Sequence, residues 1–357
     1  MCHDLGNYIC SKELIGQGSF SKVYMGLDKI SKMKVAIKKI KKQKIKSNIC
    51  KIYKEIEILQ TLNHINIVKF LDCVETEKYI FIITEYCNTC TLIQYISTLK
   101  SDLSESQIFY FLNQIKNGLQ YLKQYNIMHR DLKPENILLT IPDQEDKTFK
   151  NCIVKIADFG SANYFTDDEV INTLCGTPYY LAPEIIKFES YTTKADLWSV
   201  GMIFYQLVFR KSIFSKTEMS LLYAQQTMIS MPQNIQSPEL NSLLSNLLML
   251  DPQNRLSWAE FFDHTWFINS DTNINTNAEE LNQYIFKNTD EINNQKYIMS
   301  VLNYENLVLD VLPDEINDIY LQSLCIEHEN HIKFPEKINE WTCKFYKSIH
   351  VDDNYFF

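Results

Sequence analysis

Apolar residues recur at helical spacing in three stretches of the chain and gather in runs elsewhere. The helical spacing predicts helices over residues 48–61, 108–125 and 237–248, and the longest apolar run, residues 197–209, fits a buried helix. The short runs indicate strands, because such runs bounded by turn residues are typical of a sheet. The strands are expected over residues 8–15, 34–38, 67–72, 79–84, 137–139 and 153–157. Strands therefore dominate the first quarter of the chain, and helices dominate most of the remaining three quarters.

Polar residues mark the starts of several helices. Ser104 is followed three positions later by Gln107, and Ser257 is followed by Glu260. Each pair is a capping box, in which the two side chains satisfy free backbone N–H groups at the start of a helix. Ser237 precedes a proline, which suits the first turn of a helix. These signals support the helices expected from the apolar spacing.

Composition narrows the class of protein. The chain has 357 residues, of which 45% are hydrophobic and 22% are charged, as expected for one large or two medium globular domains. Its formal net charge of −9 argues against a broad nucleic-acid surface, so no nucleic-acid partner is predicted. The longest apolar run, residues 197–209, is too short to cross a bilayer, so no membrane span is predicted.

The ten cysteines show no framework of paired positions. Cys87 and Cys90 form a lone C-x-x-C without a second pair, which argues against a zinc site. Residues 1–10 lack the apolar segment of a secretory signal. Reduced thiols and a cytoplasmic location are therefore expected, with the nucleus left open.

Two glycines follow the first predicted strand, in the stretch IGQGSFSKV at residues 15–23. Gly16 and Gly18 allow the backbone to pass close to a phosphate, toward which backbone N–H groups can point. Residues that favour a strand come next, which argues against a Rossmann dinucleotide site, where the glycines open a helix. The stretch therefore predicts a turn between two strands that covers a phosphate. After Gly16 and Gly18, Ser21 is the third small residue of this turn, which we call its third small position.

Polar side chains occur at two further places where apolar segments end. The stretch HRDLKPEN at residues 129–136 lies between a predicted helix and a predicted strand, so it forms a tight loop held by the core. Asp158 ends the strand at residues 153–157 and is followed by Phe159 and Gly160. An acidic group at a strand end beside glycine suits a metal-bound phosphate.

These stretches together resemble the motifs of eukaryotic-type protein kinases. The resemblance extends through TLCGTP at residues 173–178 and APE at residues 182–184. It implies an α+β fold with two lobes: a small antiparallel-sheet lobe with one main helix, and a larger, mostly helical lobe. The small lobe is expected over about residues 8–86 and the large lobe over about 87–268. Residues 1–268 would form the kinase domain, and residues 269–357 a linker and a C-terminal tail of unknown function.

The resemblance implies ATP and Mg²⁺ as cofactors and a role for each polar group. Lys38 would hold phosphates and be fixed by Glu55. Asp131 would accept or orient the proton of the substrate hydroxyl, and Lys133 would neutralise charge on the γ-phosphate. Asn136 and Asp158 would bind the metal. The other nucleotide contacts would come from Ile15, Gly16, Gln17, Gly18, Ser19, Val23, Ala36, Glu85, Cys87 and Leu138.

The class of substrate and the mode of regulation are also implied by the resemblance. Lys133 and the stretch GTPY at residues 176–179 resemble those of Ser/Thr kinases, which implies protein substrates. Arg130 would pair with a phosphate on Thr173. An upstream kinase would add this phosphate, or another regulatory protein would control its addition. Arg255 is expected to pair with Glu184.

Three features resemble the autophagy-initiating Ser/Thr kinases: the stretch EYCN at residues 85–88, the long loop before Asp158, and TLCG at residues 173–176. Two alternatives stay open. The chain could be a calmodulin-regulated or AMP-activated-like kinase. It could also be a nucleotide-binding scaffold or pseudokinase that acts through its C-terminal tail.

Overall fold

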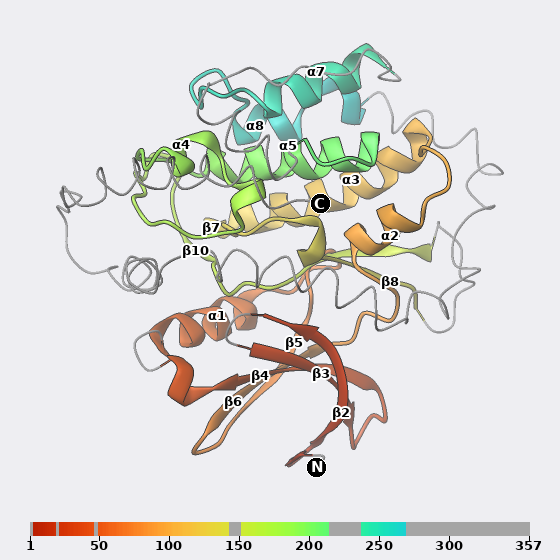
Figure 1. Cartoon of the computed structure of the whole chain (residues 1–357), viewed down its shortest axis with the longest axis vertical. Helices are drawn as coiled ribbons and strands as arrows, with labels where there is room; N and C mark the ends of the chain where they lie inside the picture. Colours follow the sequence, from red (N-terminus) through yellow and green to blue (C-terminus); the bar gives the residue numbers. More distant parts are fainter. Residues whose placement is uncertain (1–2, 19–20, 46–48, 143–150, 214–236, 269–357) are drawn as a thin grey trace, which may run out of the picture.

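The computed structural model describes residues 3–18, 21–45, 49–142, 151–213 and 237–268. A small lobe built on one sheet lies below a larger helical lobe in Figure 1. The sheet has six strands in the order β1-β2-β3-β4-β6-β5, and neighbouring strands are antiparallel. The strands are β1 His3–Leu5, β2 Tyr8–Gln17, β3 Ser21–Asp28, β4 Lys34–Lys41, β5 Phe70–Glu75 and β6 Tyr79–Glu85.

The two faces of this sheet have different neighbours, because side chains alternate along each strand. Ile40 of β4 belongs to the core that also contains Ile56 and Leu59 of helix α1, Ile49–Thr61. We call this side of the sheet the inner face. Val35 and Ile37 point the opposite way, into a second apolar cluster on what we call the outer face. That cluster consists of Leu5, Tyr8, Cys10, Val35, Ile37, Phe81 and Ile83.

The large lobe is mainly helical, and its longest described helices pack around one core. Helix α5 is buried on nearly all sides and contacts α3 and α7. The helices are α2 Leu92–Thr98, α3 Glu105–Gln124, α4 Pro183–Ile186, α5 Lys194–Phe209, α7 Pro238–Leu247 and α8 Trp258–Phe262. The short strands are β7 Ile127–Met128, β8 Ile137–Thr140, β9 Ile153–Ile156 and β10 Asn163–Tyr164. Short 3-10 turns are η1 Lys42–Ile45, η2 Pro134–Asn136 and η4 Pro178–Tyr180.

The predicted helix starts are confirmed by the hydrogen bonds at their caps. Ser104 and Ser257 each form a complete capping box with the residue three positions later. The hydroxyl of Ser237 accepts a hydrogen bond from the backbone N–H of Leu240 at the start of α7. No helix in the described part of the chain is long and apolar enough to cross a membrane.

The strand predicted over residues 67–72 was wrong in position. Strand β5 begins only at Phe70 and continues to Glu75. Ile67 and Val68 are buried, but they face the large lobe: the backbone N–H of Val68 donates to the carbonyl of Ile156 at 2.9 Å. Strand β1 was not predicted, and with it the sheet of the small lobe begins at His3 and not near residue 8. Helix α2 was not predicted either.

The expected pair between Glu184 and Arg255 is confirmed. The two terminal guanidinium nitrogens of Arg255 donate to the Glu184 carboxylate, at 2.7 and 2.9 Å, and both side chains are buried. The guanidinium also lies 5.3 Å from the ring centre of Trp198 in α5. This pair therefore joins α4 to the segment before α8 in the core of the large lobe.

Candidate active site

Three charged groups from three elements meet between the lobes. Lys38 of β4 donates to Glu55 of α1 at 2.7 Å and to Asp158, just after β9, at 2.8 Å. Burial disfavours the charged form of Lys38 and acts to lower its pKa. The nearby carboxylates of Asp158 and Glu55 have the larger combined effect, so the pKa of Lys38 is raised above its ordinary value. Lys38 in turn lowers the pKa of Asp158, so that carboxylate is ionised. Burial raises the pKa of Glu55, although Lys38 acts in the opposite direction.

The loop at residues 129–136 places a carboxylate beside an ammonium group. The hydroxyl of Thr177 donates to Asp131 Oδ1 at 2.6 Å and accepts from Lys133 Nζ at 2.7 Å. The other Asp131 oxygen lies 3.3 Å from Lys133 Nζ. The side-chain amide of Asn136 donates to the Asp131 carbonyl at 2.8 Å. A hydroxyl between Asp131 and Lys133 thus finds both an acceptor and a cation.

Asp196 at the start of α5 fixes the backbone of this loop. Its two oxygens accept hydrogen bonds from the backbone N–H groups of His129, at 2.7 Å, and Arg130, at 3.0 Å. Arg130 has a left-handed φ of 63°, which costs a residue with a side chain some free energy. Burial raises the pKa of Asp196, while His129 and the two backbone N–H groups lower it. The hydrogen bonds to Asp196 hold the loop in its strained conformation.

The segment after β9 is held against the same loop. Phe159 is buried with its ring centre 5.0 Å from that of His129. The His129 ring also contacts the carbonyl of Ala157 at 3.1 Å, and the backbone N–H of Ala157 donates to the Asn136 carbonyl at 2.9 Å. Asp158, like Arg130, has a positive φ, of 61°. These contacts direct the Asp158 carboxylate towards Lys38.

The predicted nucleotide contacts fall into two groups. Val23 lies directly opposite Lys38 in the β3–β4 ladder, and Ala36 lies two residues before Lys38, so all three share the inner face. Gly16 pairs with Val23, and the backbone N–H of Gly18 donates to the Ser21 carbonyl at 2.9 Å. The turn is therefore closed by the residue at the third small position. Ile15 and Gln17 lie in β2, and Ser19 lies outside the described residues.

The second group lies where the lobes join. Leu138 of β8 forms a bridge with Thr91, and the N–H of Leu139 donates to the Cys90 carbonyl, which brings β8 beside the segment containing Cys87. Burial raises the pKa of the Cys87 thiol to about 12. Glu85 ends β6 within this connection.

The side chain of Glu85 has a role that was not predicted. Its Oε1 accepts a hydrogen bond from the backbone N–H of Lys69 and an ion-pair contact from Lys155 Nζ, both at 2.7 Å. Lys155 also donates to the carbonyl of Ile65 at 3.0 Å. The sequence signal was weak, because Lys155 appeared only as one polar position in a buried strand. The pair ties the connection between the lobes to β9.

Thr173 lies beside Arg130, the residue that the resemblance pairs with it. Arg130 Nη1 donates to the Thr173 hydroxyl at 2.9 Å, and Arg130 Nε donates to the Ser161 carbonyl at 2.6 Å. Tyr191, which no sequence motif singled out, donates to the Thr173 carbonyl at 2.6 Å. An added phosphate on Thr173 would therefore meet a guanidinium that is already in place.

The donor set fits a metal that is bound mainly through a nucleotide. Among the described residues, no group of three or more His, Cys, Asp or Glu side chains could hold an ion alone. Asp158 offers an ionised carboxylate. The Asn136 amide nitrogen is engaged with Asp131, so the amide oxygen is its remaining ligand atom. Mg²⁺ typically uses one or two such protein oxygens together with phosphate oxygens and water.

A two-lobed fold with these groups at the junction is the arrangement of the protein kinase class. Residues 9–267 match the protein kinase domain family. The chain belongs to this family.

Three relatives illustrate the similarity. The chain is 36% identical to serine/threonine-protein kinase atg1 of Dictyostelium discoideum, over 76% of this chain and 40% of that protein. It is 37% identical to the putative serine/threonine-protein kinase R517/R518 of Acanthamoeba polyphaga mimivirus, over 73% of this chain and 63% of that one. It is 39% identical to human serine/threonine-protein kinase ULK1, over 71% of this chain and 24% of that protein. The chain thus spans less than two thirds of each of these relatives, and the similarity confirms the expected resemblance to the autophagy-initiating kinases.

Proposed function

We propose that this chain transfers the γ-phosphate of ATP to serine or threonine hydroxyls of protein substrates. The observation that supports this best is the Thr177 hydroxyl between Asp131 and Lys133. The same carboxylate can accept the hydrogen bond of a substrate hydroxyl, and the same ammonium can stabilise charge on a transferred phosphoryl group. The names of the relatives, all serine/threonine-protein kinases, agree with this substrate class.

Each site residue then has a defined task. Lys38, fixed by Glu55, binds phosphate oxygens, and the turn at Gly16 and Gly18 covers them. Asp131 orients the attacking hydroxyl and accepts its proton. Mg²⁺, when bound with ATP, neutralises phosphate charge, and Asp158 and Asn136 are the side chains that would hold it. Backbone groups at Glu85 and Cys87 would bind the base, with Ile15, Gln17, Ser19, Val23, Ala36 and Leu138 around the nucleotide.

The test is phosphate transfer from labelled ATP and Mg²⁺ to a general protein substrate, with the modified residues mapped. Asp131→Asn should lower the transfer rate about a hundredfold or more, since general-base groups contribute on this scale. Lys38→Met should abolish measurable transfer. Lys41→Met, three positions along the same strand and exposed, is the matched control and should retain activity. Equal rates for Asp131→Asn and the parent would refute the assignment.

We further propose that residues 1–268 form the catalytic domain and that a phosphate on Thr173 activates it. The contact of Thr173 with Arg130 supports this regulation, and an upstream kinase or regulatory protein would supply it. We also propose a reducing cytoplasmic setting, in which the seven described cysteines stay as free thiols. The C-terminal residues 269–357 lie outside the described part of the chain.

A further inference from the structure

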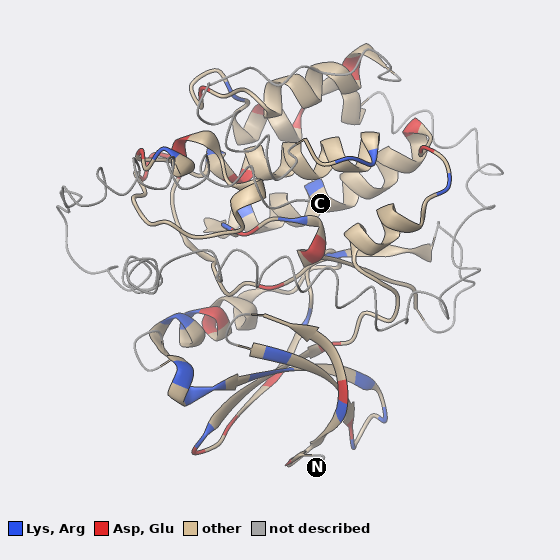
Figure 2. Ribbon diagram, in the orientation of Figure 1, with Lys and Arg blue, Asp and Glu red and all other residues tan. Residues whose placement is uncertain are grey.

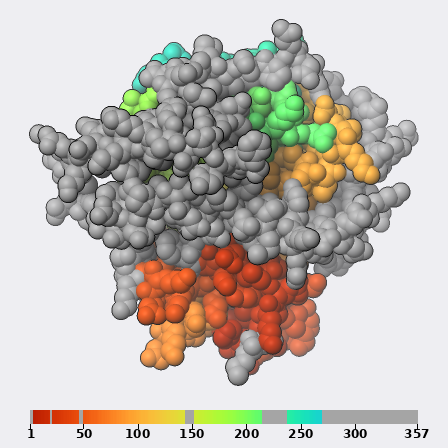
Figure 3. Space-filling view, in the orientation of Figure 1, coloured from red at the N-terminus to blue at the C-terminus, as the bar shows by residue number. Residues whose placement is uncertain are grey.

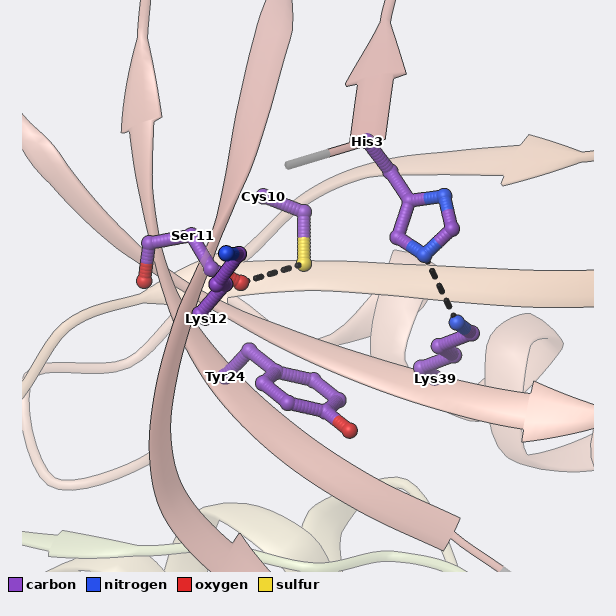
Figure 4. A pocket seen from close by; sticks show the side chains of 6 residues that line it. All are labelled: His3, Cys10, Ser11, Lys12, Tyr24 and Lys39. Atoms are coloured by element: carbon purple, nitrogen blue, oxygen red, sulfur yellow. Dashed lines mark hydrogen bonds between the residues drawn. The ribbon is translucent and has the colours of Figure 1, made fainter. Parts of the chain in front are cut away.

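The outer face of the small-lobe sheet carries a hollow of about 260 Å³ on the side opposite Lys38. Figure 4 shows His3, Cys10, Ser11, Lys12, Tyr24 and Lys39 around it, contributed by four neighbouring strands. No carboxylate is among these six lining residues. Two lysines, a histidine, a serine and a tyrosine therefore line one hollow, and the two ammonium groups suit an anion.

The surroundings of the hollow add positive charge. Lys22 lies directly opposite Lys39 in the β3–β4 ladder, so both side chains are on the outer face. Lys41 follows two positions after Lys39, on the same side, and Lys12, Lys22 and Lys41 are exposed. Like charges at directly opposed positions destabilise a sheet. The arrangement thus has an electrostatic cost that a bound anion would offset. Figure 2 shows the basic segments along the strands of this lobe.

Contacts within the hollow do not cancel its charge. Lys39 Nζ lies 2.9 Å from His3 Nε2 and 4.2 Å from the ring centre of Tyr79. Burial and the nearby Lys39 lower the pKa of His3, so at neutral pH the imidazole accepts a hydrogen bond from Lys39 and adds no charge of its own. Lys39 is therefore held in place by a neutral ring and an aromatic face. Its positive charge stays directed at the hollow.

The chain itself contains a segment of matching charge. The first 86 residues have 15 lysines, no arginine, and 9 Asp and Glu. Residues 269–357 have 16 Asp and Glu against 6 lysines and no arginine. The negative charge of the chain is thus concentrated after the catalytic domain, and the surplus of positive charge lies in the small lobe.

The length of this segment allows it to reach the small lobe. Helix α8 lies in the large lobe, beyond α5 as seen from the small-lobe sheet (Figure 1), and the visible teal residues of this part of the chain lie at the top of Figure 3, away from the red strands. A compact domain of 268 residues has a radius of gyration of about 18 Å. About 20 extended residues cover roughly 65 Å, more than the diameter of such a domain. The 89 residues from 269 to 357 are therefore long enough to reach the small lobe.

We propose that the outer face around Lys12, Lys22, Lys39 and Lys41 is the docking surface for the acidic segment 269–357 of the same chain. Carboxylates of that segment enter the hollow beside Lys39, and the surrounding lysines attract the rest of it. This docking is separate from phosphate transfer, because it uses the face of the sheet that does not carry Lys38.

Carbodiimide cross-linking of the full chain tests this, since the reagent joins a lysine directly to a carboxylate that contacts it. At low ionic strength, mapped cross-links should join Lys12, Lys22 or Lys41 to Asp or Glu residues within 269–357. They should decrease about tenfold or more in 1 M NaCl, where the screening length is about 3 Å. The ion pair between Lys123 and Asp167 is an internal positive control for the reagent.

Two matched variants distinguish this face from the general charge of the lobe. Lys22→Glu/Lys41→Glu should lower cross-linking at Lys12 about tenfold, because two surface charges change sign. Lys32→Glu/Lys34→Glu makes the same charge change at two exposed positions, one just before β4 and one at its first residue, and should leave cross-linking at Lys12 unchanged. Circular dichroism of each variant confirms that it is folded.

Three results would overturn the proposal. The first is an equal decrease in both variants. The second is cross-linking of residues 269–357 mainly to lysines elsewhere, or the absence of such cross-links while the Lys123 control forms. The third is that a mixture of isotope-labelled and unlabelled chains gives only links between chains, which would make the occupant a second copy.

Discussion

Lys155 and Glu85 form an ion pair of 2.7 Å that connects the strand before Asp158 to the junction of the lobes. We expect Lys155→Met to raise the KM for ATP about threefold to tenfold and to change kcat less, because the backbone proposed to bind the base loses a support while the proposed reacting groups keep theirs. Loss of one partner of a partly exposed pair should also cost about 1–2 kcal/mol of stability. Steady-state kinetics and thermal unfolding of the same preparation measure both effects.

Glu85→Gln is the matched control for this pair. The amide oxygen can still accept hydrogen bonds from Lys69 and Lys155, so the change in KM should be smaller than for Lys155→Met. If Lys155→Met had the parent's KM and melting temperature, the pair would have no role in positioning the nucleotide.

The buried pair of Glu184 and Arg255 gives a prediction about stability. Glu184→Gln should lower the free energy of unfolding by about 3–5 kcal/mol, because a buried guanidinium loses its counter-charge. Urea unfolding measures this as a lower midpoint at an unchanged slope. Glu57→Gln removes the carboxylate of an exposed pair with Lys54 and should change stability by no more than about 0.5 kcal/mol. Similar losses in the two variants would contradict the argument from burial.

Thr173 gives a prediction about regulation. Phosphorylated parent protein should be about tenfold more active than Thr173→Ala, because the phosphate would pair with Arg130 and fix the segment. Arg130→Met should make activity independent of the state of Thr173, which separates this pairing from a general effect of added charge. Thr166→Ala, in the same segment, is the control and should behave as the parent. Full activity of Thr173→Ala would exclude the switch.

Cys87 gives a prediction about pH. Its pKa is raised to about 12 because burial disfavours the thiolate. Below that pH the reactive thiolate is a minor species, so alkylation of Cys87 should be slow at pH 8 and accelerate about tenfold for each pH unit. Exposed Cys50, in α1, should react first. Iodoacetamide labelling followed by peptide mapping gives both rates, and faster labelling of Cys87 at pH 8 would refute the prediction.

The sequence pointed to the kinase motifs because their groups occupy ordered positions beside buried segments. The cap at Ser104 and the buried run of α5 also came from local rules that the structure obeys. The strand expected at residue 67 began three residues late, since Ile67 and Val68 pack on β9 and not in the sheet. An apolar run shows that residues are buried but not which element they face.

Other features depended on partners that are distant along the chain. Strand β1 has only three residues and no period of its own; its pairing with β2 defines it. Helix α2 does have a local signal, because Thr91 and Gln94 form a capping box, but the helix is short and lies close to the end of β6. The role of Glu85 depends on Lys155, 70 positions later, and Tyr191 reaches Thr173 only through the folded segment.

The two hydrogen bonds to Asp196 have a consequence for how this protein can evolve. In the proposed reaction Asp131 and Asp158 contribute to phosphate transfer, whereas Asp196 holds the strained backbone at His129 and Arg130. A descendant could lose either of the first two carboxylates, become inactive and still fold. Loss of Asp196 would leave two inward-facing N–H groups without acceptors, which destabilises the loop whatever its chemistry. Inactive descendants should therefore have lost Asp131 or Asp158 but kept Asp196. The residue that supports the loop would then be retained after the activity is lost.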